Sequence, residues 1–289
     1  MRTPRPILIV PFLALLAAGL AYGVGQEPAV VRAEPVAGAV HVLFGQGGNI
    51  GVSAGPDGLL LVDDQFERLA REIEAALAKL APEAGAPRFL VNTHHHGDHT
   101  DGNKHFGKRA VVVAHENVRA RLLEEGAPPQ SLPVVTHADG LSLHWNGEEL
   151  RLLHVPGGHT DGDTAVWFTG SNVIHLGDLY FQVGYPFVDV ASGGNVVGLA
   201  EGLRALLAKL PEDVRVIPGH GTVTGKAELA EYVTMLETIT ARVRTHLAEG
   251  RDVAAMMAAG VTRDFDGRWG KFDFIPPQRF VESVVASLR

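Results

Sequence analysis

The pattern of apolar and polar positions begins with short apolar runs that are separated by turn residues. Three such runs are punctuated by Gly47-Gly48 and by Pro56-Asp57-Gly58, and they lie at residues 40–44, 50–53 and 59–63. Apolar runs of this length bounded by glycine and proline predict a β-meander. The Pro- and Ala-containing segment before them, residues 26–35, is interpreted as a short lead into the fold.

Helical spacing then alternates with strand-like runs. Apolar residues recur every three or four positions from residue 66 to 80, and Pro82 closes this predicted helix before a buried-looking strand. The strands predicted after it lie at 88–92, 111–113, 134–136, 141–145, 150–155, 165–168, 173–176 and 214–217. The further predicted helices lie at 116–123, 196–210, 227–247 and 280–288.

This order of elements indicates an α/β fold. We expect two mixed sheets packed face to face with helices outside, a four-layer sandwich in which loops at one edge carry the chemistry. A chain of 289 residues with 46% hydrophobic content can bury a large core. Because no linker divides the pattern, residues 26–289 are predicted to form one catalytic domain.

The charge balance limits the kinds of partner. The chain has 25 Lys and Arg against 33 Asp and Glu, a formal net charge of −8. It has no basic run longer than the pair Lys108-Arg109. Nucleic acid is therefore not expected to bind, because it requires a basic patch or stripe. A small-molecule substrate is expected instead, and the oligomeric state is left open.

The first residues have the composition of an export signal. Arg2 and Arg5 precede an apolar run at 7–20, which is followed by small residues. This arrangement predicts a signal peptide over residues 1–25, a periplasmic or secreted protein, and no stable membrane insertion after processing. The alternative is an uncleaved membrane anchor over residues 7–25, which Pro11 and the glycines disfavour.

Candidate metal ligands are concentrated in the segment Thr93-His94-His95-His96-Gly97-Asp98-His99-Thr100. An extended backbone directs His94 and His96 to one side and His95 to the other. Since the chain has no cysteine, every metal ligand must be a nitrogen or an oxygen, and imidazole and carboxylate are ligands that Zn²⁺ accepts. A solvated histidine-rich loop is the alternative interpretation.

Three further candidates follow predicted strands later in the chain. His159, Asp178 and His220 each stand beside a glycine, which lets the backbone approach a crowded ion. One such residue alone is more typical of a turn. Together with the histidine cluster, however, the three favour a catalytic metal site.

These motifs resemble those of the metallo-β-lactamase-fold hydrolase superfamily, from about Val40 to Leu247. The resemblance implies an αβ/βα sandwich with two zinc ions. It implies that His94, His96 and His159 bind the first ion, that Asp98, His99 and His220 bind the second, and that Asp178 bridges them. It also implies that Asp63, which follows the third strand, hydrogen-bonds behind the histidine cluster.

One departure from the β-lactamase branches bears on the substrate. Asp178 stands where those branches have cysteine or serine, so the chain is more similar to glyoxalase-II-like enzymes and lactonases. Residues 179–183, Leu-Tyr-Phe-Gln-Val, offer no cation to hold a substrate carboxylate. Hydrolysis of β-lactams is therefore kept as an alternative without specific support.

The expected chemistry is hydrolysis at a carbonyl carbon. Two divalent ions that share a bridging water lower its pKa, so that a hydroxide can attack an ester, lactone, thioester or cyclic amide. Asp98 and Asp178 are the candidate catalytic residues. Residues 44–49 are expected to form a mobile flap and residues 180–195 an apolar lip. The alternatives from other classes are a mononuclear-iron persulfide-type oxygenase and a metal-binding protein without turnover.

Overall fold

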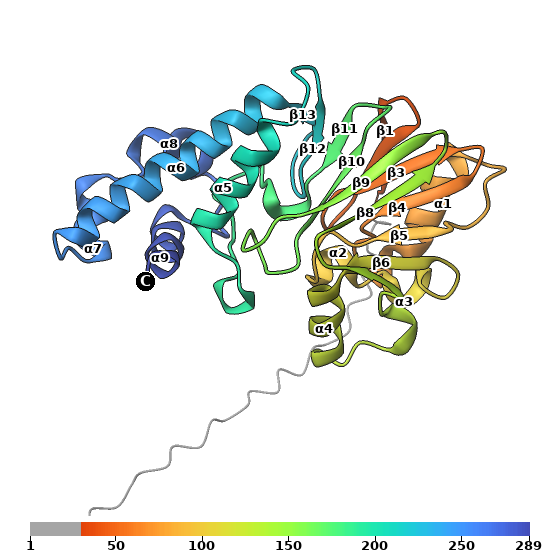
Figure 1. The fold of residues 1–289 in the computed structure, drawn as a ribbon, viewed down its shortest axis with the longest axis horizontal. Helices are drawn as coiled ribbons and strands as arrows, with labels where there is room; N and C mark the ends of the chain where they lie inside the picture. The colour runs from red at the N-terminus through yellow and green to blue at the C-terminus, as the bar shows by residue number, and fades with distance from the viewer. Residues whose placement is uncertain (1–29) are drawn as a thin grey trace, which may run out of the picture.

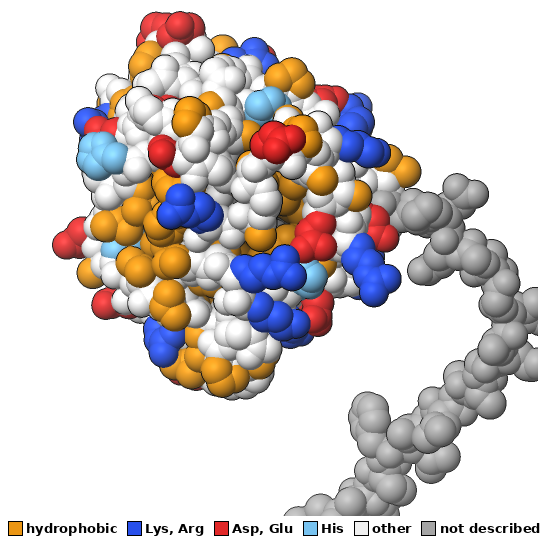
Figure 2. All heavy atoms as spheres, turned by 90° about the vertical axis from the view of Figure 1, so that its right-hand side faces the viewer, with side chains coloured by type: hydrophobic (Ala, Val, Ile, Leu, Met, Phe, Trp, Pro, Cys, Tyr) orange, Lys and Arg blue, Asp and Glu red, His pale blue; other side chains and the backbone are white. Residues whose placement is uncertain are grey.

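The computed structural model of the chain describes residues 30–289, in which two β-sheets pack face to face (Figure 1). The predicted signal peptide lies outside the described residues. None of the helices in the described part combines the length and apolar character that crossing a bilayer requires. On the face shown in Figure 2, acidic and basic side chains are interspersed, with apolar patches between them.

The first sheet has seven strands in the order of the sequence. They are β1 (Arg32–Ala37), β2 (Val40–Phe44), β3 (Ile50–Gly55), β4 (Gly58–Val62), β5 (Phe89–Val91), β6 (Val111–His115) and β7 (Val135–His137). Pairing is antiparallel from β1 to β4 and parallel from β4 to β7. The sheet is therefore mixed, as predicted, with its parallel strands leading into the histidine cluster.

The second sheet has six strands in the order β13-β12-β11-β10-β9-β8. Their bounds are β8 (Gly140–Trp145), β9 (Glu148–His154), β10 (Thr164–Phe168), β11 (Val173–His175), β12 (Arg215–Ile217) and β13 (Thr224–Gly225). Only β11 and β12 pair in parallel, so this sheet is mixed as well.

Alternating side chains in the buried strands join the layers. In β4, Leu60 and Val62 pack between the two sheets, whereas Leu59 and Leu61 pack against the helix on the outer face. Successive residues of a strand point to opposite faces, so a continuous apolar run fills two layers at once.

Helices cover both outer faces. Helix α1 (Ala70–Leu80) packs on the first sheet, and α5 (Val196–Leu207) and α6 (Lys226–Ala248) cover the second, while α9 (Pro277–Ser287) packs against α5 and α6 (Figure 1). The remaining helices are short: α2 (Gly97–Thr100), α3 (Asn103–Phe106), α4 (Glu116–Glu124), α7 (Val253–Ala259) and α8 (Arg263–Trp269). Single 3-10 turns are η1 (Glu67–Leu69), η2 (Pro129–Ser131), η3 (Gly177–Leu179) and η4 (Val190–Ser192). The predicted four-layer α/β sandwich is confirmed.

Candidate metal centre

The seven predicted ligands meet in loops that follow strands of both sheets. Residues 94–99 come directly after β5 of the first sheet, where α2 turns the chain. The second sheet provides the other three: His159 from the loop between β9 and β10, Asp178 from η3 after β11, and His220 after β12. The ligand set is therefore divided between the two halves of the sandwich.

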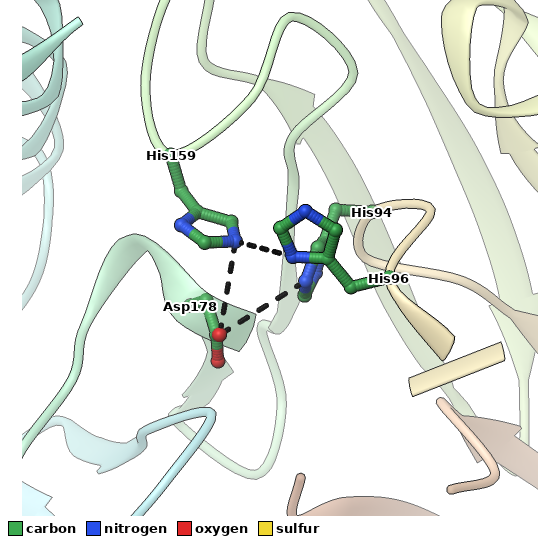
Figure 3. A group of neighbouring side chains, drawn as sticks. All are labelled: His94, His96, His159 and Asp178. Atoms are coloured by element: carbon green, nitrogen blue, oxygen red, sulfur yellow. Dashed lines mark hydrogen bonds and ion pairs between the residues drawn. The ribbon is translucent and has the colours of Figure 1, made fainter. Parts of the chain in front are cut away.

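The first group of donor atoms belongs to His94, His96, His159 and Asp178 (Figure 3). Asp178 Oδ2 lies 4.0 Å from His94 Nε2 and 3.7 Å from His159 Nε2. His159 Nε2 lies 2.9 Å from His96 Nδ1. Ligands of one tetrahedral zinc ion are separated by roughly 3.3 Å, given bonds of about 2.0–2.1 Å, so these separations fit around one ion.

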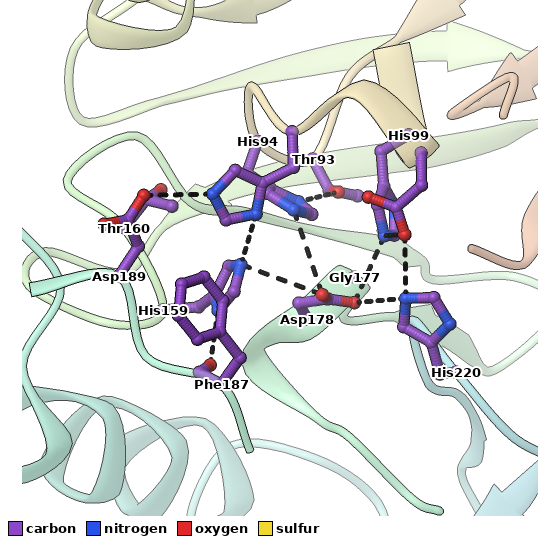
Figure 4. Close-up of polar contacts among 12 residues, drawn as sticks. Thr93, His94, His99, His159, Thr160, Gly177, Asp178, Phe187, Asp189 and His220 are labelled. Atoms are coloured by element: carbon purple, nitrogen blue, oxygen red, sulfur yellow. Dashed lines mark hydrogen bonds and ion pairs between the residues drawn. The ribbon is translucent and has the colours of Figure 1, made fainter. Parts of the chain in front are cut away.

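The second group contains Asp98, His99 and His220. His99 and His220 face the other oxygen of Asp178 (Figure 4). Asp178 Oδ1 lies 3.2 Å from His99 Nε2 and 3.4 Å from His220 Nε2. Asp98 Oδ2 lies 3.1 Å from His220 Nε2. One carboxylate thus faces both groups, which is the arrangement expected of a residue that bridges two ions.

The outward-facing ring nitrogens of the first group are held by acceptors. His96 Nε2 lies 3.1 Å from Asp189 Oδ2, and His159 Nδ1 lies 2.8 Å from the carbonyl oxygen of Phe187. Each acceptor requires a proton on the nitrogen that it faces. The inward-facing atoms, His96 Nδ1 and His159 Nε2, therefore carry lone pairs.

Asp63 fixes two more imidazoles. Its Oδ2 lies 2.7 Å from His99 Nδ1, so the predicted hydrogen bond behind the cluster is confirmed. The same oxygen accepts the hydroxyl proton of Thr93 at 2.8 Å, which leaves the Thr93 oxygen to accept from His94 Nδ1 at 3.0 Å. His94 Nε2 and His99 Nε2 consequently direct lone pairs inward as well.

Inward-facing lone pairs provide a test of whether a metal fits. His96 Nδ1 and His159 Nε2 are 2.9 Å apart, and neither carries the proton that a hydrogen bond between them would need. Three buried atoms around them have no hydrogen-bond partner in the described part of the chain: His94 Nε2, His99 Nε2 and Asp178 Oδ1. Converging lone pairs repel unless a cation lies between them, so the donor set fits a divalent metal.

The electrostatics favour the ligand form of His94, His159 and Asp178. Burial lowers the pKa of His94 well below its usual value and that of His159 to about 4, which keeps both imidazoles neutral. Burial alone would raise the pKa of Asp178, but His220 and His99 hold it well below its usual range. His99 is the exception: burial opposes its charge, yet Asp178, Asp63 and Asp98 raise its pKa well above the usual value, so a metal ion that binds there must displace the proton from Nε2.

The loop at residues 44–49 is tied to both sides of the centre and does not stand free as a flap. The Gly48 amide donates to the carbonyl of Asp98 at 3.0 Å, and the Asn49 amide donates to that of Gly219 at 2.7 Å. The Asn49 side chain donates to the carbonyls of Pro218 and Gly221 on either side of His220. This loop therefore positions ligands of the second group.

The other sequence-based assignments can be placed as well. His95 is buried and belongs to neither group, although its ring centre lies 4.6 Å from that of His96; its Nε2 lies 3.8 Å from Glu125 Oε1. His115 accepts from the Asn117 amide and caps α4, so it is not a ligand of either group. The sequence interpretation missed Asp189 and Thr93. Thr93 precedes the histidine motif directly, so its position was a signal, but nothing in the sequence around Asp189 marks it as a partner of His96.

Comparisons with known proteins show what this chain is similar to. The sequence profile described as the metallo-beta-lactamase superfamily matches residues 45–220. A hydroxyacylglutathione hydrolase of Anaeromyxobacter dehalogenans is 31% identical over 190 residues, 65% of this chain and 67% of that protein. A type 2 metallo-beta-lactamase of Bacteroides fragilis is 26% identical over 176 residues, 60% of this chain and 66% of that protein.

Solved structures support the fold. The crystal structure of DIM-1 metallo-beta-lactamase is similar with a TM-score of 0.63 at 20% identity, covering 72% of this chain and 98% of that one. The chain spans between about half and three quarters of the length of the curated hydroxyacylglutathione hydrolases that it matches, with 51% in Methylococcus capsulatus, 67% in Anaeromyxobacter dehalogenans and 77% in Haemophilus influenzae.

Proposed function

This chain belongs to the metallo-β-lactamase superfamily, and we propose that it is a dinuclear zinc hydrolase that cleaves an acyl bond at a carbonyl carbon. The observation that carries the proposal is the division of Asp178 between two groups of donor atoms. Seven nitrogen and oxygen ligands exceed the three or four that one catalytic zinc uses. They also exceed the facial three-ligand set of a mononuclear iron oxygenase.

When bound, two zinc ions would supply an acidified water and electrophilic assistance to the carbonyl oxygen. The chain's own contribution is to hold the ligands and to leave one side open. The side chains of Asp98 and His220 are 31% and 24% exposed, whereas His94, His99 and His159 are 1% exposed or less. Asp98 therefore lies where water and substrate enter, and its carboxylate accepts a hydrogen bond that orients the attacking water.

Thioesters are the leading substrate class. Several relatives are named hydroxyacylglutathione hydrolases, and an acylglutathione carries its acyl group as a thioester. Water would add to the carbonyl carbon, the C–S bond would break, and a carboxylate and a thiol would leave. Esters and lactones react by the same addition. Residues 179–183 contain no cation that could hold the carboxylate of a β-lactam. β-Lactams are still included among the test substrates, because the chain is similar to a metallo-beta-lactamase.

The test combines metal analysis with a substrate panel. The zinc-loaded protein is expected to retain two ions per chain and to hydrolyse thioesters, esters or lactones with higher kcat/KM than a penicillin or carbapenem. Asp178→Asn should keep the fold and lose kcat on the order of 100-fold or more, since an amide cannot bridge two cations as a carboxylate does. Asp57→Asn, a substitution in an exposed turn, is the matched control.

One zinc ion per chain, or wild-type turnover by Asp178→Asn at saturating zinc, would contradict the dinuclear assignment. A β-lactam that outperforms every neutral acyl substrate would make β-lactam hydrolysis the primary function.

A further inference from the structure

Two exposed phenylalanines lie in the loop that joins α8 to α9. In residues 30–289, Phe272 and Phe274 are the aromatic members of the group of large exposed apolar side chains, at 37% and 53% exposure. Their neighbour Ile275 is buried at 1% and anchors the loop. Apolar side chains left in water next to one another commonly mark a binding surface.

These side chains continue a row of rings that begins at the second group of ligands. The ring of Phe181 lies 5.0 Å from that of His220, and Phe272 lies 5.4 Å from Phe181. Phe274 lies 6.1 Å from Phe272. These centroid separations are within the range in which aromatic rings contact one another.

The row ends at the first group of ligands. Phe187 lies 6.1 Å from Phe274, 5.8 Å from His96 and 5.9 Å from His159. We call the four rings of Phe181, Phe272, Phe274 and Phe187 the aromatic arc. The arc runs from His220 on one side of the candidate metal centre to His96 and His159 on the other, so it borders the place where a carbonyl would react.

Arg279 holds two of the four rings of the arc, Phe187 and Phe274. The guanidinium carbon lies 5.7 Å from the centre of the Phe187 ring and 5.3 Å from that of Phe274, within the reach of cation–π attraction. Arg279 also donates to the carbonyl oxygen of Phe274 at 3.2 Å, and it forms no ion pair with a carboxylate among the described residues. The rings are thereby kept in place beside the centre.

We propose that the aromatic arc binds an apolar acyl group of the substrate, so that the enzyme prefers medium-chain or aryl acyl compounds over short ones. This inference rests on the hydrolase function proposed above and specifies its substrate. The four side chains of the arc offer no hydrogen-bonding group, and two of them are exposed; covering them with alkyl or aryl surface removes apolar area from water. A polar acyl group would not gain this contribution from the four rings.

The first experiment measures chain-length dependence. The substrates are S-acetyl, S-butyryl and S-octanoyl N-acetylcysteamine, and the released thiol is titrated without background because the chain has no cysteine. We expect kcat/KM to rise by at least about tenfold from acetyl to octanoyl, since each buried methylene is worth roughly two- to fourfold. The double variant Phe272→Ala/Phe274→Ala should lose most of this octanoyl-to-acetyl ratio.

Leu123→Ala is the matched control, because it removes a side chain of similar exposure, 51%, on α4. It should keep the wild-type ratio. Equal kcat/KM for all three acyl lengths in the wild-type protein, or an unchanged ratio in the double variant, would overturn the inference while leaving the hydrolase function standing.

A binding experiment separates the two proposals. The thioether S-octyl N-acetylcysteamine has no carbonyl to hydrolyse, and its affinity for the zinc-loaded protein can be measured calorimetrically. We expect it to bind the wild-type protein at least tenfold more tightly than S-ethyl N-acetylcysteamine, and the double variant to lose this difference. Length-dependent binding without hydrolysis of any acyl substrate would support the arc and contradict the hydrolase, and equal affinities would contradict the arc.

Discussion

At the scale of single residues, the candidate metal centre depends on the hydrogen-bond acceptors that hold the outward-facing nitrogens of its histidines. The acceptors at Asp63, Thr93, Asp189 and the Phe187 carbonyl each fix one imidazole ring and its tautomer. Such partners behind metal ligands typically change metal affinity 10- to 100-fold. Asp189 is partly buried, with 17% of its side chain exposed, and its other oxygen accepts from the Ser192 amide at 3.1 Å.

We therefore expect Asp189→Ala to weaken the first zinc site about 10- to 100-fold, because His96 loses the acceptor for its Nε2–H. Asp189→Asn retains an acceptor oxygen without the charge. Its zinc affinity should lie between those of Asp189→Ala and the wild-type protein. Competition with a chromophoric chelator measures the affinity. Asp161→Ala, which removes a nearby carboxylate that pairs with Arg121, serves as the control. Equal zinc affinity in all four proteins would show that Asp189 does not position His96.

The sequence alone predicted which seven residues would converge, because each was a nitrogen or oxygen donor beside a glycine or within the histidine motif. It did not predict Asp189, since the partner of an imidazole nitrogen is chosen by the path of a loop in three dimensions. The aromatic arc escaped prediction for a similar reason. Phe181 and Phe187 belong to the predicted lip, but Phe272 and Phe274 arrive from a loop far along the chain.

At the scale of elements, the loop at residues 44–49 is the clearest case in which packing determines the residue type. A Cβ atom built on Gly48 would overlap the imidazole ring of His99, and one built on Gly47 would meet the carbonyl oxygen of Asp98. Glycine is therefore required by the close approach of the loop to the second group of ligands.

Gly48→Ala should displace His99, weaken the second zinc site and cost about 1–3 kcal/mol of unfolding free energy, as overpacking of a tight interior does. Urea denaturation and zinc titration measure the two effects. Gly267→Ala in α8, where an added Cβ atom meets nothing within 4 Å, is the control; it should leave the zinc affinity unchanged and should not destabilise the fold, because alanine favours a helix over glycine by about 0.5–1 kcal/mol. Wild-type zinc affinity in Gly48→Ala would mean that the loop moves to accommodate the added methyl group and that His99 keeps its position.

Elements were predicted best where their apolar pattern was long. Strand β1 was taken for an irregular lead because Pro35 and polar neighbours break its pattern; it is an edge strand, where proline and exposed positions are tolerated. Helices α7 and α8 and the two-residue strand β13 were also missed. Each of these elements is too short to give a periodic pattern in the sequence. They are held in place by packing against α6 and α9.

At the scale of the whole molecule, export stays a prediction of the sequence. A processed chain should begin between residues 22 and 27 and occur in the periplasm or outside the cell. Intact-mass measurement of protein recovered from cell fractions decides this. A chain that begins at Met1 and partitions with membranes would favour the anchor.

Because the ligands are divided between the two sheets, a bound metal ion is expected to stabilise the folded protein. An ion held by residues 94–99 and by His220 would cross-link segments far apart in the chain, and closing a long loop restricts the unfolded ensemble. Proteins of oxidising compartments gain such cross-links from disulfides, which a chain without cysteine cannot form.

Removal of the metal by a chelator should therefore destabilise this protein, as reduction destabilises a disulfide-bonded protein. We expect removal of the metal to lower Tm and to speed digestion by a non-specific protease, with both effects reversed by zinc and absent for magnesium. Equal digestion rates with and without chelator would show that the two halves hold each other by packing alone. In the predicted surroundings of this protein, scarcity of zinc would then shorten its lifetime as well as stop its turnover.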